Sequence, residues 1–271
     1  MQPPDIELVE AVVTAVKQSR KYSPTAEETL RALAVEALRQ HKKVKPAVKA
    51  VRQRLHGIMA PYLGDPDYDR AAAELTAAYA SRDPERGRAV CRELMTTHLS
   101  TRERLPILEE FYGAIWAVTG RPQVLLDIAC GLNPLAVDWM GLPPDVAYYA
   151  YDIHEGRVAF LNQYLSLRGL PPLARVQDVA LRPPIQVGDV ALFLKEMQRF
   201  EPNYPGRGRV LLEETPVRYF VVSFPTVSAR GGRNLTARYR AFMADLVAGR
   251  PWPVTALLFD SEVVFCVKRE T

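Results

Sequence analysis

The sequence predicts an α/β protein in which an N-terminal bundle of helices precedes a mainly parallel, seven-stranded sheet. Two observations lead to this fold class. From Pro106 onward, short apolar runs alternate with helical patterns, as in the βαβ units of a parallel sheet. Before that point, apolar residues recur at helical spacing. We therefore expect a helical domain over residues 1–104 and an α/β domain over residues 105–271.

The helices of the N-terminal domain are predicted from apolar residues that recur every three or four positions. Such a stripe packs into a core while the opposite face stays polar. Thr25 and Glu28 are spaced as a capping box, which marks the beginning of the second helix. The predicted helices lie within residues 8–16, 25–38, 44–59, 68–79 and 81–99.

The charge of this N-terminal domain is one-sided. Between Glu36 and Asp65 the sequence has no acidic residue, although the whole chain carries 31 Asp and Glu against 35 Lys and Arg. A merely soluble surface mixes both signs, so the window favours a face that binds nucleic acid. The alternative is a solvated helix face without a partner. The candidate RNA-binding residues in this window are Lys42, Lys43, Lys45, Lys49, Arg52 and Arg54.

Composition and cysteine spacing narrow the class of protein. Cys91, Cys130 and Cys266 are far apart and form no CxxC pair, which argues against a disulfide framework and a zinc site. No apolar run is long enough to cross a bilayer, and the chain begins without the pattern of a secretory signal. We therefore expect a reduced, cytoplasmic protein without a metal or a membrane segment. Nothing in the sequence resembles a coiled coil or a large apolar interface, so we expect a monomer.

Seven short apolar runs are the predicted strands of the α/β domain. They lie at residues 124–128, 147–151, 174–176, 190–194, 219–223, 254–259 and 263–267, with helical patterns within residues 135–140, 155–168, 196–214 and 235–247. Only Asp260, Ser261 and Glu262 join the last two runs, which fits an antiparallel hairpin at the sheet edge. This is the outline of a class I methyltransferase that depends on S-adenosylmethionine (SAM), with a Rossmann-like sheet.

The stretch from Leu125 to Ala136, LLDIACGLNPLA, predicts a nucleotide-type cofactor site. It reads as a buried strand that ends at the acid Asp127, followed by a turn of small residues that contains Ala129 and Gly131. Ligands of parallel sheets bind at the carboxyl ends of the strands. The turn lacks the later glycines of the dinucleotide fingerprint GxGxxG, so it favours SAM over NAD.

Two further acids stand at the ends of the next two predicted strands. Asp152 ends the second strand, where a carboxylate binds the ribose hydroxyls of a nucleotide. Asp178 ends the third strand, where it can accept a hydrogen bond from the adenine amino group. The alternative, that these acids only form turns, does not predict that they stand in register. With their neighbours Ile153 and Val179, they complete the predicted cofactor site.

Charged and aromatic residues near other strand ends are candidates for substrate contacts. An arginine of the segment from His98 to Leu105 could clamp the carboxylate of SAM, but the residues alone favour a surface salt bridge with Glu103 or Glu109. Lys195 follows the fourth strand, where class I methyltransferases place groups that handle the target, and Glu201 lies six residues on. A last candidate is an aromatic side chain at the end of the fifth strand that could stack on a target base, namely Phe224.

At this point the chain resembles the Arm family of aminoglycoside-resistance 16S rRNA methyltransferases. The motifs that carry the resemblance are LLDIACGLNPLAVDWM, STRERLP, VQDV, LFLKEMQRFE and VVSFPTVSARGGR, from roughly Thr97 to the C-terminus. These enzymes use SAM to methylate N7 of guanine 1405 in the decoding site of the 30S subunit. The methylation confers resistance to 4,6-disubstituted 2-deoxystreptamine aminoglycosides.

The resemblance also implies roles for individual residues. Arg104 would contact the SAM carboxylate and Gly131 the cofactor at the first turn, with Asp152 on the ribose and Asp178 beside the adenine. The other implied residues are Lys195 and Glu201 around the target base, and Arg230 and Arg233 on phosphates. The sequence departs from the family pattern at Val227 and over residues 234–242, beside the expected target loop.

Two other functions remain open from the sequence. One is SAM-dependent methylation of another position in rRNA or tRNA, such as the neighbouring adenine N1. The other is a non-catalytic RNA-binding protein on the same fold, against which the intact acids Asp127, Asp152 and Asp178 argue. Guanine N7 carries an in-plane lone pair, so methylation there requires alignment and exclusion of water rather than a general base.

Overall fold

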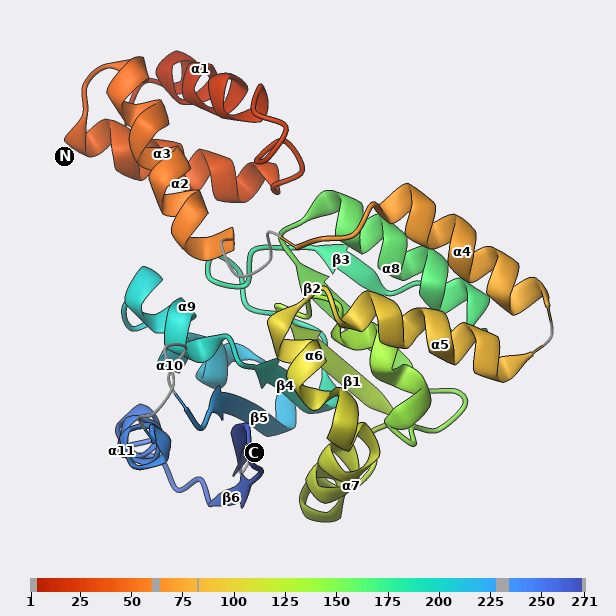
Figure 1. Ribbon diagram of the computed structural model, residues 1–271. Coiled ribbons are helices and arrows are strands. Elements are labelled where there is room, and N and C mark those ends of the chain that lie inside the picture. Colours follow the sequence, from red (N-terminus) through yellow and green to blue (C-terminus); the bar gives the residue numbers. More distant parts are fainter. Residues whose placement is uncertain (1–3, 60–63, 82, 228–233, 270–271) are drawn as a thin grey trace.

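The computed structural model describes residues 4–59, 64–81, 83–227 and 234–269 of the chain. Within these residues one seven-stranded sheet has the order β3-β2-β1-β4-β5-β7-β6 (Figure 1). Neighbouring strands from β3 to β5 pair in parallel, and β7 runs antiparallel to β5 and β6. The predicted fold class and terminal hairpin are therefore confirmed. The strands are β1 (Val124–Ile128), β2 (Ala147–Asp152), β3 (Ala174–Val176), β4 (Gly188–Leu194), β5 (Val217–Pro225), β6 (Val254–Leu258) and β7 (Glu262–Lys268).

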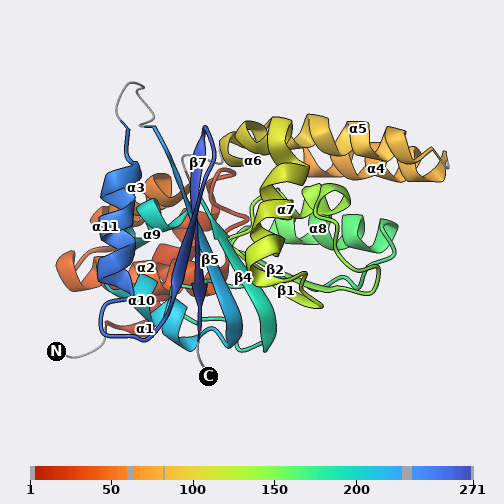
Figure 2. The ribbon, with the colours of Figure 1, turned by 90° about the horizontal axis from the view of Figure 1, so that it is seen from below.

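Helices cover both faces of the sheet (Figure 2). Successive residues of a strand point to opposite faces, so an apolar run is buried on both sides only when both faces are covered. Leu125 accordingly packs into one hydrophobic core and Leu126 into the other. On the first side lie α7 (Leu108–Thr119), η3 (Asn133–Trp139) and α8 (Glu155–Leu167), and on the second α9 (Met197–Asn203), α10 (Arg207–Glu214) and α11 (Thr236–Leu246).

The first three helices form a bundle with a hydrophobic core of its own. They are α1 (Ile6–Lys17), α2 (Glu27–Gln40) and α3 (Val44–Met59), and Figure 1 shows them grouped beside the sheet domain. Val12, Leu30 and Leu55 are fully buried in this core, at the positions of the predicted apolar stripes. We call α1, α2 and α3 the N-terminal bundle.

The remaining N-terminal helices belong to the sheet domain. They are α4 (Tyr68–Ala80), α5 (Pro84–Met95) and α6 (Leu99–Arg104), followed by the short η2 (Leu105–Ile107). Leu75 of α4 and Cys91 of α5 are buried in the same core as α8 and η3. The hydrophobic cores therefore divide between Met59 and Tyr68 rather than at the expected domain boundary of residue 104, because helical spacing does not reveal which core a stripe enters.

Two local expectations also differ from the structure. The helical pattern within residues 196–214 is two helices, since α9 ends at Asn203 and α10 begins after Gly206, whose φ of +77° lies outside the helical region. The expected capping box is absent, since α2 is preceded by Ala26 without a side-chain cap. The hydroxyl of Thr25 instead faces the sulfur of Met59, and Glu28 accepts a hydrogen bond from the backbone of Asp178.

Candidate cofactor and target-base site

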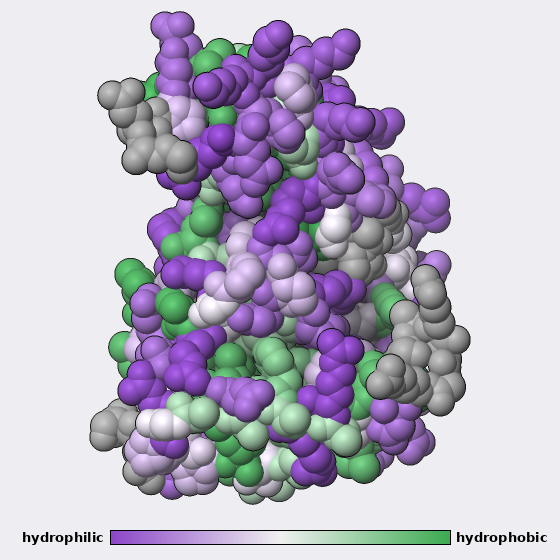
Figure 3. All heavy atoms as spheres, turned by 90° about the vertical axis from the view of Figure 1, so that its left-hand side faces the viewer, coloured by the Kyte–Doolittle hydropathy of each residue, from purple (hydrophilic) through white to green (hydrophobic). Residues whose placement is uncertain are grey.

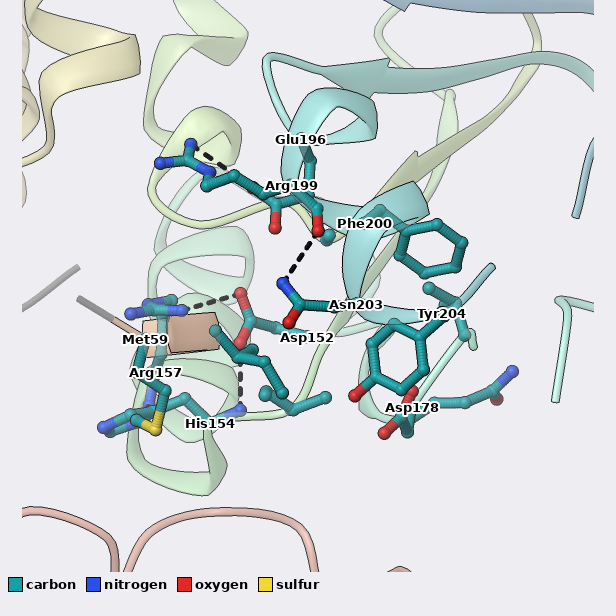
Figure 4. Close-up of a pocket in the computed structure, with 15 residues that line it drawn as sticks. Met59, Asp152, His154, Arg157, Asp178, Glu196, Arg199, Phe200, Asn203 and Tyr204 are labelled. Carbon is teal, nitrogen blue, oxygen red and sulfur yellow. Dashed lines mark hydrogen bonds and ion pairs between the residues drawn. The ribbon is translucent and has the colours of Figure 1, made fainter. Parts of the chain in front are cut away.

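A pocket opens at the carboxyl ends of β1, β2 and β3, and α9 and the end of α3 close it (Figure 4). It contains five predicted cofactor residues: Ala129, Asp152, Ile153, Asp178 and Val179. Sequence reasoning missed the other lining residues, which come from α3, α8, α9 and the end of β3. They are Ile58, Met59, His154, Arg157, Gln177, Glu196, Arg199, Phe200, Asn203 and Tyr204.

Asp152 is held in place by three donors. Its carboxylate accepts hydrogen bonds from the backbone of Gly131 (3.1 Å), the backbone of His154 (2.9 Å) and the Nη1 of Arg157 (2.7 Å). Figure 4 shows the last two on either side of the carboxylate. A carboxylate has about four acceptor sites, so one remains for a ligand hydroxyl. The first-turn glycine thus positions the predicted ribose acid through its backbone.

A buried polar cluster lies behind Asp152. The Arg157 guanidinium also binds both oxygens of Asp65 (2.9 and 3.0 Å) and the hydroxyl of Tyr68 (3.0 Å), and Nε2 of His98 lies 2.6 Å from Asp65. Burial alone would raise the pKa of the Asp65 carboxyl, but the His98 hydrogen bond and the Arg157 charge hold it well below its usual range. The cluster connects the start of α4 and the start of α6 to the predicted ribose site.

Asp178 is shared between its own loop and the N-terminal bundle. Its carboxylate accepts hydrogen bonds from the Thr29 hydroxyl (2.8 Å) and the Ala180 backbone (2.9 Å). Burial raises the pKa of Asp178, and the Thr29 hydrogen bond opposes that shift. Figure 4 shows Asp178 beside Tyr204 at one end of the pocket.

Arg104 is buried rather than at the surface, so the alternative of a surface salt bridge with Glu103 or Glu109 is wrong. Its Nε donates to Glu262 (2.9 Å) and its Nη1 to the side-chain oxygen of Asn133 (3.0 Å). Among the residues that the structure describes, its Nη2 has no hydrogen-bond partner. A buried guanidinium nitrogen without a partner is costly, and a ligand carboxylate would satisfy it.

Asp127 is fully enclosed below the first turn. Its carboxylate accepts from the Tyr148 hydroxyl (2.6 Å) and the side-chain amide of Asn133 (2.9 Å). Burial raises the pKa of Asp127 to about 7, against the hydrogen bonds and the Arg104 charge. Asn133 therefore joins Arg104 to Asp127, and together they suit the oppositely charged carboxylate and ammonium of an amino acid.

Lys195 follows β4 in a strained conformation. Its φ is +54°, and Ala129 has a φ of +51°; among the described residues these are the only non-glycine positions with positive φ. Such strain persists where surrounding contacts impose it, and it clusters at functional sites. The backbone of Lys195 donates to Ser223, and its Nζ lies 2.5 Å from Glu103 and 3.2 Å from Glu262.

Glu262 is a residue that sequence reasoning missed. It is 0% exposed and accepts from Arg104, from the Ser223 hydroxyl and from Lys195. In the sequence it looks like the end of a hairpin turn, and only the pairing of β5 with β7 brings it to the ends of β4 and β5. The buried Glu262 carboxylate thus binds both Arg104, which was predicted to contact SAM, and Lys195, which was predicted to contact the target base.

Two predicted target-base residues have structural roles instead. The Glu201 carboxylate accepts from the backbones of Gly206 (2.5 Å) and Gly208 (2.9 Å), so it caps the start of α10 and does not line the pocket of Figure 4. Phe224 is 0% exposed and stacks on Tyr239 with ring centroids 4.3 Å apart. At this position of β5 the ring faces the core, and Phe224 and Glu201 also border a second pocket beside α11.

The basic residues of the N-terminal bundle divide into two groups. Lys42, Lys43, Lys45 and Lys49 are exposed, and Figure 3 shows hydrophilic residues over the bundle, in the upper part of that view. Arg52 and Arg54 turn inward, contrary to expectation: their guanidinium groups donate to the carbonyls of Ala15 and Asn203. The other two candidates, Arg230 and Arg233, lie outside the described residues.

In the described part of the chain, no group of three His, Cys, Asp or Glu residues could hold a metal ion. In the same residues, none of the helices combines the length and apolar character that a membrane span requires. The three cysteines are buried and unpaired.

The strand order, the pocket at the ends of β1 to β3 and the acids at the ends of β2 and β3 define a class I methyltransferase. Within this class, the chain belongs to the ribosomal RNA methyltransferase (FmrO) family, whose model matches residues 18–266.

Similar proteins span almost the whole chain. A protein of Frankia casuarinae named 16S rRNA (guanine(1405)-N(7))-methyltransferase is 36% identical over 266 residues, which cover 96% of this chain and 94% of that protein. One of the same name from Micromonospora echinospora is 32% identical, with 96% and 97% covered. The crystal structure of 16S rRNA methyltransferase RmtF in complex with S-adenosyl-L-homocysteine superimposes with a TM-score of 0.81 at 28% identity, covering 98% of this chain and all of that one. The 16S rRNA methylase RmtB gives 0.79 at 28% identity, with 99% and 100% covered.

Proposed function

We propose that the protein uses SAM to methylate N7 of guanine 1405 in the 16S rRNA of the assembled 30S subunit. The observation that carries this proposal is the pocket at the carboxyl ends of β1, β2 and β3, which is lined by the predicted cofactor residues. Relatives of this chain are named for the same activity. We further propose that the methylation confers resistance to 4,6-disubstituted 2-deoxystreptamine aminoglycosides, and that the protein acts in the cytoplasm, where its substrate is found.

The residues of the site suit the three parts of SAM. Among the described residues, the Nη2 of Arg104 has no partner and suits the carboxylate of SAM. Asp127 is linked to Arg104 through Asn133 and suits the amino group of SAM. Asp152 retains an acceptor for the ribose, and Asp178 can accept from the adenine amino group. Bound SAM supplies a methyl group that its sulfonium already activates.

The protein then has to orient the guanine rather than deprotonate it. The edge of guanine that carries N7 also carries O6, and both atoms are acceptors. Lys195 has three N–H groups, of which two face Glu103 and Glu262, so the third can donate to O6 while the N7 lone pair stays free. Its two carboxylate partners suit Lys195 to a role as a hydrogen-bond donor.

Exposed lysines on the N-terminal bundle can bind the rRNA backbone. Lys42, Lys43, Lys45 and Lys49 are close in sequence and exposed. Contacts to phosphates are strong but read little sequence, so they can offset the few kcal/mol needed to unstack the target base. Selection of one nucleotide then depends on the shape of the folded rRNA.

The test is to incubate the protein with 30S subunits and labelled SAM and to map the modified nucleotide. Borohydride reduction and aniline cleave RNA at 7-methylguanine, and primer extension should then stop at guanine 1405. The Asp152→Asn variant should give no label. A stop without cleavage at the neighbouring adenine would assign N1 methylation instead, and SAM binding without any label would favour a non-catalytic RNA-binding protein.

A further inference from the structure

The N-terminal bundle contacts the adenosine side of the pocket through its backbone. The amide of Ala26 donates to the carbonyl of Ile153 (2.8 Å), and the amide of Glu155 donates to the carbonyl of Pro24 (2.7 Å). This short antiparallel bridge places the segment before α2 directly on the turn between β2 and α8, which carries the predicted ribose acid.

Side chains of α2 continue this contact to the end of β3. Thr29 is 1% exposed, and its hydroxyl donates to the Oδ2 of Asp178 at 2.8 Å. Glu28 accepts from the backbone amide of Asp178 (2.7 Å) and pairs with Arg182 in the same loop. The carboxylate at the adenine end of the pocket is therefore oriented from one side by its own loop and from the other by the bundle.

The end of α3 supplies part of the pocket wall. Ile58 and Met59 line the pocket opposite residues of β1 to β3, and the sulfur of Met59 faces the Thr25 hydroxyl at 3.6 Å. Arg54 fastens α3 to α9 by its bond to the Asn203 carbonyl, and it lies over the Tyr204 ring. The wall is thus complete only when the bundle is docked on the sheet domain.

We infer that the N-terminal bundle is part of the cofactor site, and that Thr29 is a positioning residue that aims the Asp178 carboxylate at the adenine amino group. The inference rests on the proposed function for the role of Asp178. Its consequence is that the domain with the exposed lysines also sets the affinity for SAM. Because such coupling is reciprocal, rRNA binding that shifts α2 would change the affinity for SAM by the same factor that SAM changes the affinity for rRNA.

The test compares two ligands that differ only at the adenine amino group, S-adenosylhomocysteine and its 6-deamino analogue, in which hydrogen replaces that group. Calorimetry measures the Kd of both ligands for the full chain, for Thr29→Val and for Thr29→Ser. Valine keeps the shape of threonine without the hydroxyl, and serine keeps the hydroxyl. A hydrogen bond to a charged group is worth enough to change affinity roughly tenfold when lost.

We expect Thr29→Val to bind S-adenosylhomocysteine about tenfold more weakly, to bind the 6-deamino analogue nearly as before, and therefore to discriminate less between them. Thr29→Ser should restore the discrimination. The matched control is Thr76→Val, the same change at an exposed threonine of α4, which should alter neither Kd.

A preference for the adenosyl ligand that is equal in the full chain and in Thr29→Val would overturn the inference. The ratio of two affinities does not depend on the fraction of folded protein, so a loss of stability in the valine variant cannot imitate the expected result. Failure of the proposed function looks different: the full chain would bind and discriminate the ligands as expected but leave guanine 1405 unmethylated.

Discussion

Glu262→Gln provides the sharpest test of the buried ion network. The Glu262 side chain is 0% exposed, Arg104 is 1% exposed and Lys195 is 4% exposed, so solvent screens none of the three. Glutamine keeps the shape and one acceptor oxygen but removes the charge that faces both cations. Breaking a buried pair costs about 3–5 kcal/mol. We expect the low end, about 3 kcal/mol, because Lys195 keeps Glu103 and Arg104 keeps Asn133.

Two assays are used: thermal unfolding measures the Tm, and calorimetry of the folded protein measures the affinity for S-adenosylhomocysteine. For a chain of this size, about 3 kcal/mol corresponds to a fall in Tm of roughly 6–12 °C. Ligand affinity should fall as well, because Arg104 loses the negative charge that orients it. The control is Glu110→Gln, an exposed carboxylate of α7, which should change stability by no more than about 0.5 kcal/mol.

A double variant separates the interaction between Arg104 and Glu262 from the contributions of the two side chains alone. Arg104→Met together with Glu262→Gln removes both charges, so the double variant should be less destabilised than the sum of the two single variants. Additive losses, or a Tm for Glu262→Gln equal to that of the Glu110 control, would refute the idea that this carboxylate compensates the buried cations.

Three further predictions concern the interior acid, the core and the bundle surface. Burial raises the pKa of Asp127 from 3.8 to about 7, so the folded state binds this proton more tightly than the unfolded chain does. The stability that this group contributes therefore falls as the pH rises from about 4 to 7. Asp127→Asn should flatten that part of the pH profile of urea unfolding, and profiles that stay parallel would contradict the prediction. Phe224→Ala should lower the free energy of unfolding by about 3–5 kcal/mol in denaturant titrations, because the ring is fully buried. The folded Phe224→Leu variant should bind 30S subunits as the unchanged chain does, and weaker binding would indicate a contact with RNA. Lys49→Ala should weaken 30S binding in filter assays and lower the salt slope by about 1 without changing SAM affinity, unlike the exposed control Arg70→Ala on α4; equal effects of the two would count against the basic face.

The elements of the α/β domain were predictable because their signals are local. A strand covered on both faces is an apolar run, and β1 and β3 have the predicted bounds while the other strands differ by one or two residues at their ends. The cofactor turn was predictable for the same reason, since a strand, an acid and a small-residue turn are consecutive in the chain. Asp152 and Asp178 followed from the rule that parallel strands end at one edge.

Side-chain partners could not be predicted, because packing sets them between distant segments. Arg104 and Glu262 are 158 residues apart, and Thr29 and Asp178 are 149 apart, so no local pattern connects them. A charged residue at a strand end looks alike in sequence whether it meets a ligand, as we propose for Lys195, or caps a helix, as Glu201 does.

The same limit applies to faces and domains. Periodicity shows that Phe224 lies on one face of a strand, but both faces of this strand are covered, so burial against Tyr239 could not be distinguished from exposure at the rim. Likewise, α4 and α5 have the apolar stripes of any bundle helix, yet they pack on α8 and η3. The sequence by itself determined the strands, the terminal hairpin and the cofactor edge of the sheet. The docking of the N-terminal bundle on that edge was decided by the tertiary structure, because long-range contacts carry no signature in local sequence.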